Sequence, residues 1–247
     1  MRKVSRNAIA FQRRVELFKR SLQVNDYNQA RAEWKRYRST VGAKSVVAAL
    51  EKMAGTRKRC VYCCDSRCSD IDHFKPVKLD FNAAFKWNNF ILICPECNRH
   101  KGAKFAYAED GSPLLIDPTT ADPWQHLILD AETGIIAPRF SGESYDLKGE
   151  YTLSVISPVN DEATAEGRRR AAEKYIELAG LSALEGDSAN ARKAFTKAVK
   201  YDEFGLAPWF AFCEGKRNHA FLSLQEKCPA LWQKFCILAC KQALNAL

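Results

Sequence analysis

Two Cys-x-x-Cys pairs constrain the fold of this chain more than any other feature of its sequence. Cys60 and Cys63 form the first pair, and Cys94 and Cys97 form the second. Each pair offers two thiolates from one tight turn, and structural zinc takes four such ligands in a tetrahedron. We therefore predict a structural zinc ion on these four cysteines. Cys64 and Cys68 could replace one member, but we interpret them as bystanders.

The start of the chain bears on how the cysteines are used. The first residues, MRKVSRNAIAFQRR, are basic but are not followed by the apolar segment of a secretion signal. No stretch approaches the ~20 continuous apolar residues of a membrane helix. We expect a cytoplasmic protein without membrane contact, in which paired cysteines bind metal rather than form disulfides.

The charge of the chain is unevenly distributed. Residues 1–59 contain 16 Lys or Arg against 4 Asp or Glu, a net charge of +12, while the whole chain carries +9. A basic segment directly before the cysteine cluster favours a nucleic-acid partner. The alternative is a solvated helical face, because Lys and Arg are also good helix formers.

The pattern of apolar residues predicts an α+β fold that is mostly helical. Phe11, Val15, Phe18 and Leu22 recur at helical spacing and predict one apolar face within a basic helical N-terminal region, residues 1–59. Residues 60–157 predict a central module with a strand and loop extension, in which LLI, LIL, GIIA and YTLSVI read as short extended segments. Residues 158–247 predict a C-terminal helical region.

Polar residues between the two cysteine pairs need a separate explanation. Asp72 and His73 end a short alternation of apolar and polar residues, Asn89 precedes an apolar strand, and Asn98 follows the last cysteine. A zinc ion with four thiolates has no open coordination position, so it cannot perform chemistry there.

The order of these residues resembles the HNH endonuclease family, whose ββα-metal site is stapled by zinc in many members. The family pattern runs C-x-x-C, Asp-His, Asn with an apolar run, then C-x-x-C-(His/Asn)-x-x-Lys. Residues 60–101 contain each element in that order. Asn98 stands where the better-known form has a metal-binding His. An amide oxygen is a harder ligand than an imidazole, which favours Mg²⁺ over softer ions.

The resemblance implies a role for each polar residue. His73 would be the general base that deprotonates a water molecule for attack on a phosphodiester. Asp72 and Asn98 would hold Mg²⁺ or another divalent cation at the scissile phosphate. Asn89 would brace the His73 loop, with Asn88 as the alternative if the alignment is shifted by one residue.

Nearby charged residues receive weaker interpretations. Arg99 or Lys101 could contact the nucleic-acid backbone. Asp70 shares a strand face with Asp72 and could serve as a reserve metal ligand, but we interpret it as a solvated turn residue. His100 lies on the opposite side of a helix from Asn98 and is not expected to bind the same ion.

Longer segments, including DIDHFKPV, WNNFILICPECNRHKG and LLIDPTTADPWQHLILD, resemble the PtuB-type HNH nucleases of Septu and retron anti-phage systems. Zorya-associated HNH effectors are a related possibility. The resemblance implies a metal-dependent endonuclease that acts on DNA or RNA beside a PtuA-like ABC/SMC-type ATPase. The segment LAPWFAFCEG and the last helix would either dock that partner or form core. The alternative function is a zinc-stabilised nucleic-acid-binding adaptor without catalysis.

Overall fold

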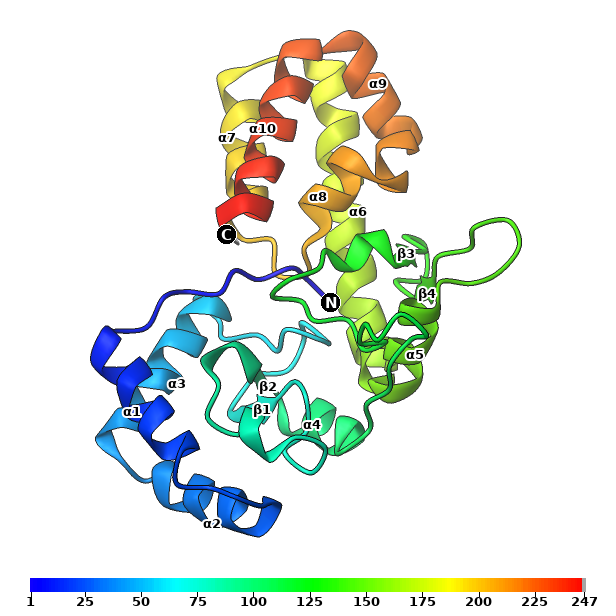
Figure 1. The fold of residues 1–247 in the computed structure, drawn as a ribbon. Helices are drawn as coiled ribbons and strands as arrows, with labels where there is room; N and C mark the ends of the chain where they lie inside the picture. The colour runs from blue at the N-terminus through cyan, green and yellow to red at the C-terminus, as the bar shows by residue number, and fades with distance from the viewer. Residues whose placement is uncertain (246–247) are drawn as a thin grey trace.

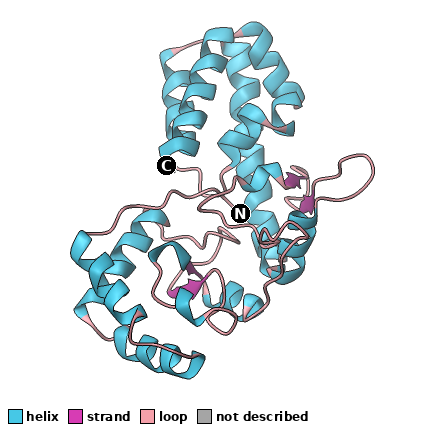
Figure 2. Cartoon of the chain, in the orientation of Figure 1, coloured by secondary structure: helices cyan, strands magenta, loops and turns pink. Residues whose placement is uncertain are grey.

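A computed structural model describes residues 1–245 of the chain (Figure 1). A bundle of C-terminal helices stands above a second lobe that contains the N-terminal helices and the central module. The first residues run along the junction between these two lobes. Helices dominate, and the strands form two small antiparallel pairs (Figure 2).

The N-terminal region begins with three helices: α1 (Phe11–Ser21), α2 (Tyr27–Tyr37) and α3 (Val41–Met53). Side chains that precede two of these helices satisfy free backbone N–H groups. Asp26 accepts from the amide of Gln29 at 2.8 Å, and Thr40 accepts from the amide of Ala43 at 3.2 Å. Such caps stabilise a helix by about 1 kcal/mol each, which explains where α2 and α3 begin.

The apolar face expected on α1 does not pack as predicted. The helix forms, but Phe11, Phe18 and Leu22 are exposed. The buried apolar residue of α1 is Leu17, on another face of the helix. Arg20 on that helix pairs with Glu33 of α2, so a charged contact joins the two helices.

The central module is a hairpin followed by a helix: β1 (Asp70–His73), β2 (Phe90–Ile93) and α4 (Pro95–Lys101). The strands are antiparallel, with His73 opposite Phe90. Between them lie two short 3₁₀ helices, η1 (Phe81–Ala83) and η2 (Trp87–Asn89). All four residues of β2 are buried, which anchors the hairpin in the lobe.

An extension connects the module to the bundle. It contains η3 (Pro123–Gln125), β3 (Leu127–Leu129), β4 (Ile136–Pro138), α5 (Leu147–Val155) and η4 (Ser157–Asn160). The expected strand at YTLSVI is wrong, because most of that segment lies in α5. Asp146 caps the helix by accepting from the amide of Gly149 at 2.8 Å.

The C-terminal helices are α6 (Glu162–Glu185), α7 (Ala189–Lys200), α8 (Leu206–Phe212), α9 (His219–Lys227) and α10 (Pro229–Asn245), with η5 (Glu214–Arg217) between α8 and α9. The fully buried Arg168 of α6 ties the bundle to the extension by donating to the backbone carbonyls of Gly134 and Val159. In the segment LAPWFAFCEG, Trp209 and Phe210 are buried, so most of this segment is core rather than a docking surface.

The predicted α+β class, mostly helical around a small ββα unit, is confirmed. One apolar core runs from Met1 to Ala239 and crosses both boundaries between residues 1–59, 60–157 and 158–247. The division into those three units remains a prediction. Within residues 1–245, none of the helices has the length and apolar character needed to cross a membrane.

Candidate active site

The four predicted zinc ligands meet at one buried point. The Sγ atoms of Cys60, Cys63, Cys94 and Cys97 all lie within 4.8 Å of one another, and those of Cys63 and Cys94 are 3.9 Å apart. A tetrahedron with Zn–S bonds of about 2.3 Å has sulfur atoms ~3.8 Å apart, so the quartet fits zinc. A hydrogen bond from the Cys60 thiol lowers the pKa of Cys63 to about 6, which favours the thiolate form.

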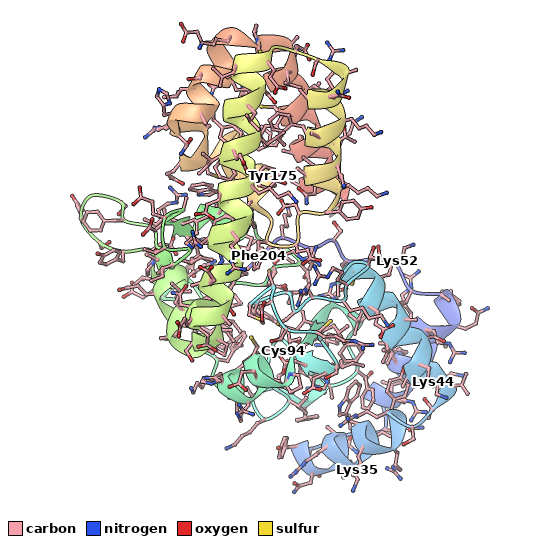
Figure 3. The ribbon with its side chains drawn as sticks, turned by 180° about the vertical axis from the view of Figure 1, so that it is seen from behind. Lys35, Lys44, Lys52, Cys94, Tyr175 and Phe204 are labelled. Carbon is pink, nitrogen blue, oxygen red and sulfur yellow. The ribbon has the colours of Figure 1, made fainter. Side chains whose placement is uncertain are left out.

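Cys64 and Cys68 are not part of this cluster. Cys68 donates its thiol to the carbonyl of Lys58 at 2.9 Å, and Cys64 lies 3.9 Å from the carbonyl oxygens of Val61 and Tyr62. In Figure 3, Cys94 lies at the beginning of the helix that follows the hairpin. The quartet therefore joins the segment before β1 to the start of α4.

Two carboxylates of β1 face two polar side chains of α4. Asp70 and Asp72 are two residues apart and share one face of the strand. The Nδ2 of Asn98 donates to Oδ2 of Asp70 at 3.0 Å. The ammonium of Lys101 lies 2.9 Å from Oδ2 of Asp72. The strand and the helix thus bring together the oxygen atoms of Asp70, Asp72 and Asn98, with the buried Lys101 ammonium beside them.

Burial sets the protonation of Asp72. Removal from water raises the pKa of its carboxyl to about 6, while the Lys101 ammonium opposes part of that rise. The Lys101 ammonium also donates to the backbone carbonyl of His73 at 2.8 Å, so one buried cation contacts both residues at the end of β1. A carboxylate has two oxygens, so the Asp72 side chain can pair with Lys101 and still offer an oxygen to a hard cation.

His73 lies on the other face of β1 in an aromatic pocket. Its ring packs edgewise against Trp34 of α2 at 4.7 Å between centroids and against Phe90 at 5.4 Å. Burial lowers the pKa of His73 to about 4, so the ring is neutral at pH 7. Its Nε2 lies 2.9 Å from the carbonyl of Ala84. A carbonyl can only accept, so the proton is on Nε2 and the lone pair is on Nδ1.

Asn89 connects the loop after His73 to the second strand. Its Oδ1 accepts from the amide of Lys75 at 2.7 Å, and its Nδ2 donates to the carbonyls of Lys75 and Ala83 at 3.0 and 3.1 Å. The neighbouring Asn88 is exposed. Asn89, rather than Asn88, is therefore the residue whose side chain holds the loop.

The expected contact of Lys101 with a nucleic-acid backbone is wrong. Lys101 is 0% exposed, and its ammonium is surrounded by the Asp72 carboxylate and a backbone carbonyl. Arg99 is exposed and pairs with Glu96. Both ring nitrogens of His100 are engaged, with Glu96 at 3.1 Å and Ser157 at 2.8 Å, so His100 connects α4 to η4.

Trp34 is the feature that sequence reasoning missed. For Asp70, the sequence left open a reserve role at the metal but favoured a solvated turn. The turn interpretation is wrong, because Asp70 lies in β1 and accepts from Asn98. Nothing in the sequence links Trp34 to His73, because that contact depends on how α2 packs against the hairpin.

The arrangement suits a divalent cation with few protein ligands. Asp72 and Asn98 offer oxygen atoms from facing elements, with Asp70 beside them. Within residues 1–245, the cysteine quartet is the only group of three or more His, Cys, Asp or Glu side chains close enough to share an ion. A site with one or two carboxylates fits Mg²⁺, which usually retains several water molecules.

Comparison with known proteins agrees with this geometry. Residues 60–104 match the family model described as HNH endonuclease. The central module therefore belongs to the HNH endonuclease family.

The chain is also similar to two curated proteins, each named Septu protein PtuB. It is 30% identical to that of Bacillus mycoides (strain KBAB4) over 173 residues, which are 58% of this chain and 56% of the relative. It is 28% identical to that of Bacillus thuringiensis over 123 residues, which are 48% and 42% of the two chains. The chain spans about half the length of the curated relatives it matches.

Proposed function

We propose that this protein is a metal-dependent HNH endonuclease that hydrolyses phosphodiesters of nucleic acid. The observation that carries the proposal is the state of His73: a neutral ring whose Nε2–H is held by a backbone carbonyl, leaving Nδ1 free to accept a proton. His73 directly follows Asp72 in β1, within a module of the HNH family.

In the proposed reaction, His73 Nδ1 takes a proton from a water molecule. The water oxygen forms a bond to phosphorus, and the bond between phosphorus and the leaving oxygen breaks. Asp72 and Asn98 would hold the divalent cation, which would stabilise the negative charge on the leaving oxygen until that oxygen takes a proton from solvent. Asn89 keeps the His73 loop in position through its three hydrogen bonds.

Two further residues support the catalytic residues in this proposal. Lys101 fixes the orientation of Asp72 through an ion pair and that of the His73 backbone through a hydrogen bond to its carbonyl. Trp34 and Phe90 limit the motion of the imidazole and exclude water from one side of it. Zinc on the cysteine quartet holds α4, and therefore Asn98, against β1.

The basic N-terminal helices suit a polyanionic substrate. Lys35 and Lys44 extend from α2 and α3 into solvent (Figure 3). Helix α2 also supplies Trp34, which contacts His73. A nucleic-acid strand bound along these helices would therefore pass close to His73, the proposed general base. We include DNA and RNA as substrates, since neither the base nor the cation requires a 2′-hydroxyl.

The similarity to proteins named Septu protein PtuB supports a place in anti-phage defence. We propose that the protein acts there as the nuclease subunit beside a PtuA-like ATPase, in the cytoplasm. The competing function is a zinc-stabilised adaptor that binds nucleic acid without cutting it. The adaptor explains the quartet and the basic helices but gives no purpose to the neutral His73.

The deciding experiment incubates the purified protein with plasmid, single-stranded DNA and tRNA, in Mg²⁺ or in EDTA. Each reaction is run with and without a PtuA-like ATPase, the partner proposed above. Cutting that requires Mg²⁺ and is lost in His73→Ala supports the endonuclease. Binding of all substrates without cutting, including in the presence of the ATPase, supports the adaptor instead.

A further inference from the structure

A second site lies at the junction of the two lobes, away from the hairpin. It is a cleft of about 550 Å³ lined by the N-terminal segment, the end of α3, the loop before α8, and the helices α7 and α10. Its size falls within the range of about 300–1,000 Å³ typical of small-molecule sites. The cleft lies where the start of the chain passes beneath the C-terminal bundle (Figure 1).

The walls of the cleft are strongly positive. Five cations line it: Arg2, Lys3, Lys52, Lys200 and Lys241. None of the ion pairs formed within the described part of the chain involves any of these five side chains. An anion entering the cleft would therefore not have to displace a carboxylate from them.

The two acids of the cleft are already engaged with the backbone. Asp122 accepts from the amide of Trp124 at 3.1 Å. Asp202 is buried and accepts from the amides of Leu206 and Ala207 at 3.0 and 2.7 Å, which caps the start of α8. These hydrogen bonds hold both carboxylates in place and offset part of their charge, so the field of the five cations dominates.

Three buried polar atoms of the lining have no hydrogen-bond partner within residues 1–245. They are Oγ of Ser5, Nε of Arg2 and Oε1 of Gln242. Ser5 is only 8% exposed. Such atoms are rare in folded proteins, because leaving one unpaired costs about 1–3 kcal/mol. Their gathering in one positive cleft indicates a polar ligand.

Apolar side chains complete the lining. Val4, Met53, Val199 and Leu238 lie among the cations. A purely inorganic ion would make no use of these residues, whereas a nucleoside would cover them. We propose that this cleft binds the phosphorylated form of a nucleoside, with the phosphates on the lysines and the nucleoside against the apolar side chains. This site is independent of the proposed nuclease chemistry, and the same ligand chemistry occurs in a free nucleotide and at the 5′-phosphorylated end of a strand.

The test measures binding calorimetrically on the zinc-loaded protein in buffer without added Mg²⁺ or Mn²⁺, so that no added divalent ion recruits phosphate to the module. The probes are ATP, inorganic tripolyphosphate, adenosine, and a short oligonucleotide with either a 5′-phosphate or a 5′-hydroxyl. Lys200 and Lys241 are exposed, so the double variant K200E/K241E should fold. The matched control is K216E/K227E, which makes the same charge change on the same bundle outside the cleft.

We expect ATP to bind and adenosine not to bind, with affinity lowered roughly tenfold or more in K200E/K241E and nearly unchanged in the control. Binding of only the 5′-phosphorylated oligonucleotide, with the same dependence on the lysines, would identify a strand end as the natural source. Ser5→Ala should weaken the same probe without changing the melting temperature of the free protein by more than a few degrees. Absence of binding by every phosphorylated probe, or equal weakening in both double variants, rules the site out.

Discussion

The ammonium of Lys101 lies 2.9 Å from Oδ2 of Asp72, and the lysine side chain is fully buried. Each of these two charges would be strongly destabilising if it were buried without the other. It connects α4 to the strand that carries the proposed catalytic residues. The consequences of breaking it depend on pH.

We predict that Lys101→Met destabilises the protein by about 3–5 kcal/mol at pH 8, because it leaves the Asp72 carboxylate buried without a counter-charge. The pKa of Asp72 in the folded protein is already raised to about 6 from an ordinary value of 3.8. Loss of the ammonium raises it further, so the folded variant takes up a proton more readily than the unfolded chain. The destabilisation should therefore shrink towards pH 5 and grow as the pH rises.

Urea-induced unfolding at pH 5 and pH 8 measures this difference. Lys104→Met removes an exposed lysine nearby and should change stability little at either pH. An equal loss of stability at the two pH values would show that the buried charge is not responsible.

A second prediction concerns the proton on His73. Burial lowers its pKa to about 4, so in a proton NMR titration of the zinc-loaded protein without Mg²⁺ its ring should remain neutral down to about pH 5. The signal is assigned by its loss in His73→Ala. Protonation of the His73 ring at or above about pH 6 would contradict the buried, neutral base described above.

A third prediction separates catalysis from folding. His73→Ala should lower the rate of nucleic-acid cleavage by about 10²–10⁴-fold, the usual contribution of a general base, and leave zinc content and the circular dichroism spectrum unchanged. His219→Ala, on the surface of α9, should cut as the wild type does. If His73→Ala unfolds the module, the ring has a structural role instead.

A fourth prediction follows from the pKa of Asp72. Below about pH 6 the divalent ion must displace a proton from this carboxyl, so Mn²⁺ affinity should fall by up to roughly tenfold per pH unit. Above that pH the affinity should be nearly constant. Isothermal titration of wild type and Asp72→Asn between pH 5 and 8 measures the effect, with the exposed Asp110→Asn as control. A pH dependence that survives in Asp72→Asn would assign the proton to another group.

A fifth prediction tests the quartet. Cys94→Ser should lose zinc and destabilise the module by several kcal/mol, because metal binding contributes directly to the folding of small zinc modules. Cys240→Ser changes an exposed thiol in α10 and should retain zinc and its melting temperature. Metal analysis by atomic emission and limited proteolysis of residues 60–104 provide the readouts. Zinc bound at full occupancy in Cys94→Ser would place the ion elsewhere.

The parts of the molecule that the sequence predicts well are those fixed by local spacing. Each Cys-x-x-Cys turn brings two thiols together by local spacing alone, and the four thiols of the predicted quartet meet as expected. The class of fold follows similarly from helical periodicity and short apolar runs. Asn89 contacts the loop after His73, as the HNH resemblance implied, although its catalytic role is still a prediction.

The errors arise where tertiary packing decides. Lysine is usually exposed, so nothing in the sequence indicates that Lys101 is buried against Asp72. The stripe of Phe11, Phe18 and Leu22 has the period of a buried helical face, yet no element within residues 1–245 covers it. The cleft is lined by residues as far apart in the sequence as Arg2 and Lys241, and the spacing of residues along the chain does not predict that they meet.

The position of the first residues has a consequence for how the protein is made. The amide of Arg2 donates to the carbonyl of Val61, that of Val4 to Pro118, and Arg6 donates to the carbonyl of Phe90 beside the hairpin. Gly205 also lies close against this segment, since a Cβ there would lie 2.8 Å from Cβ of Arg2. A ribosome adds about 5–20 residues per second, so the last of these contacts emerges roughly 10–40 s after the first residues. Contacts of such high sequence separation slow folding, so the approach of Gly205 to Arg2 forms later than the others. The contact between Arg6 and Phe90 needs only the chain as far as the second strand, so the hairpin that carries His73 can gain this anchor before the C-terminal helices are made.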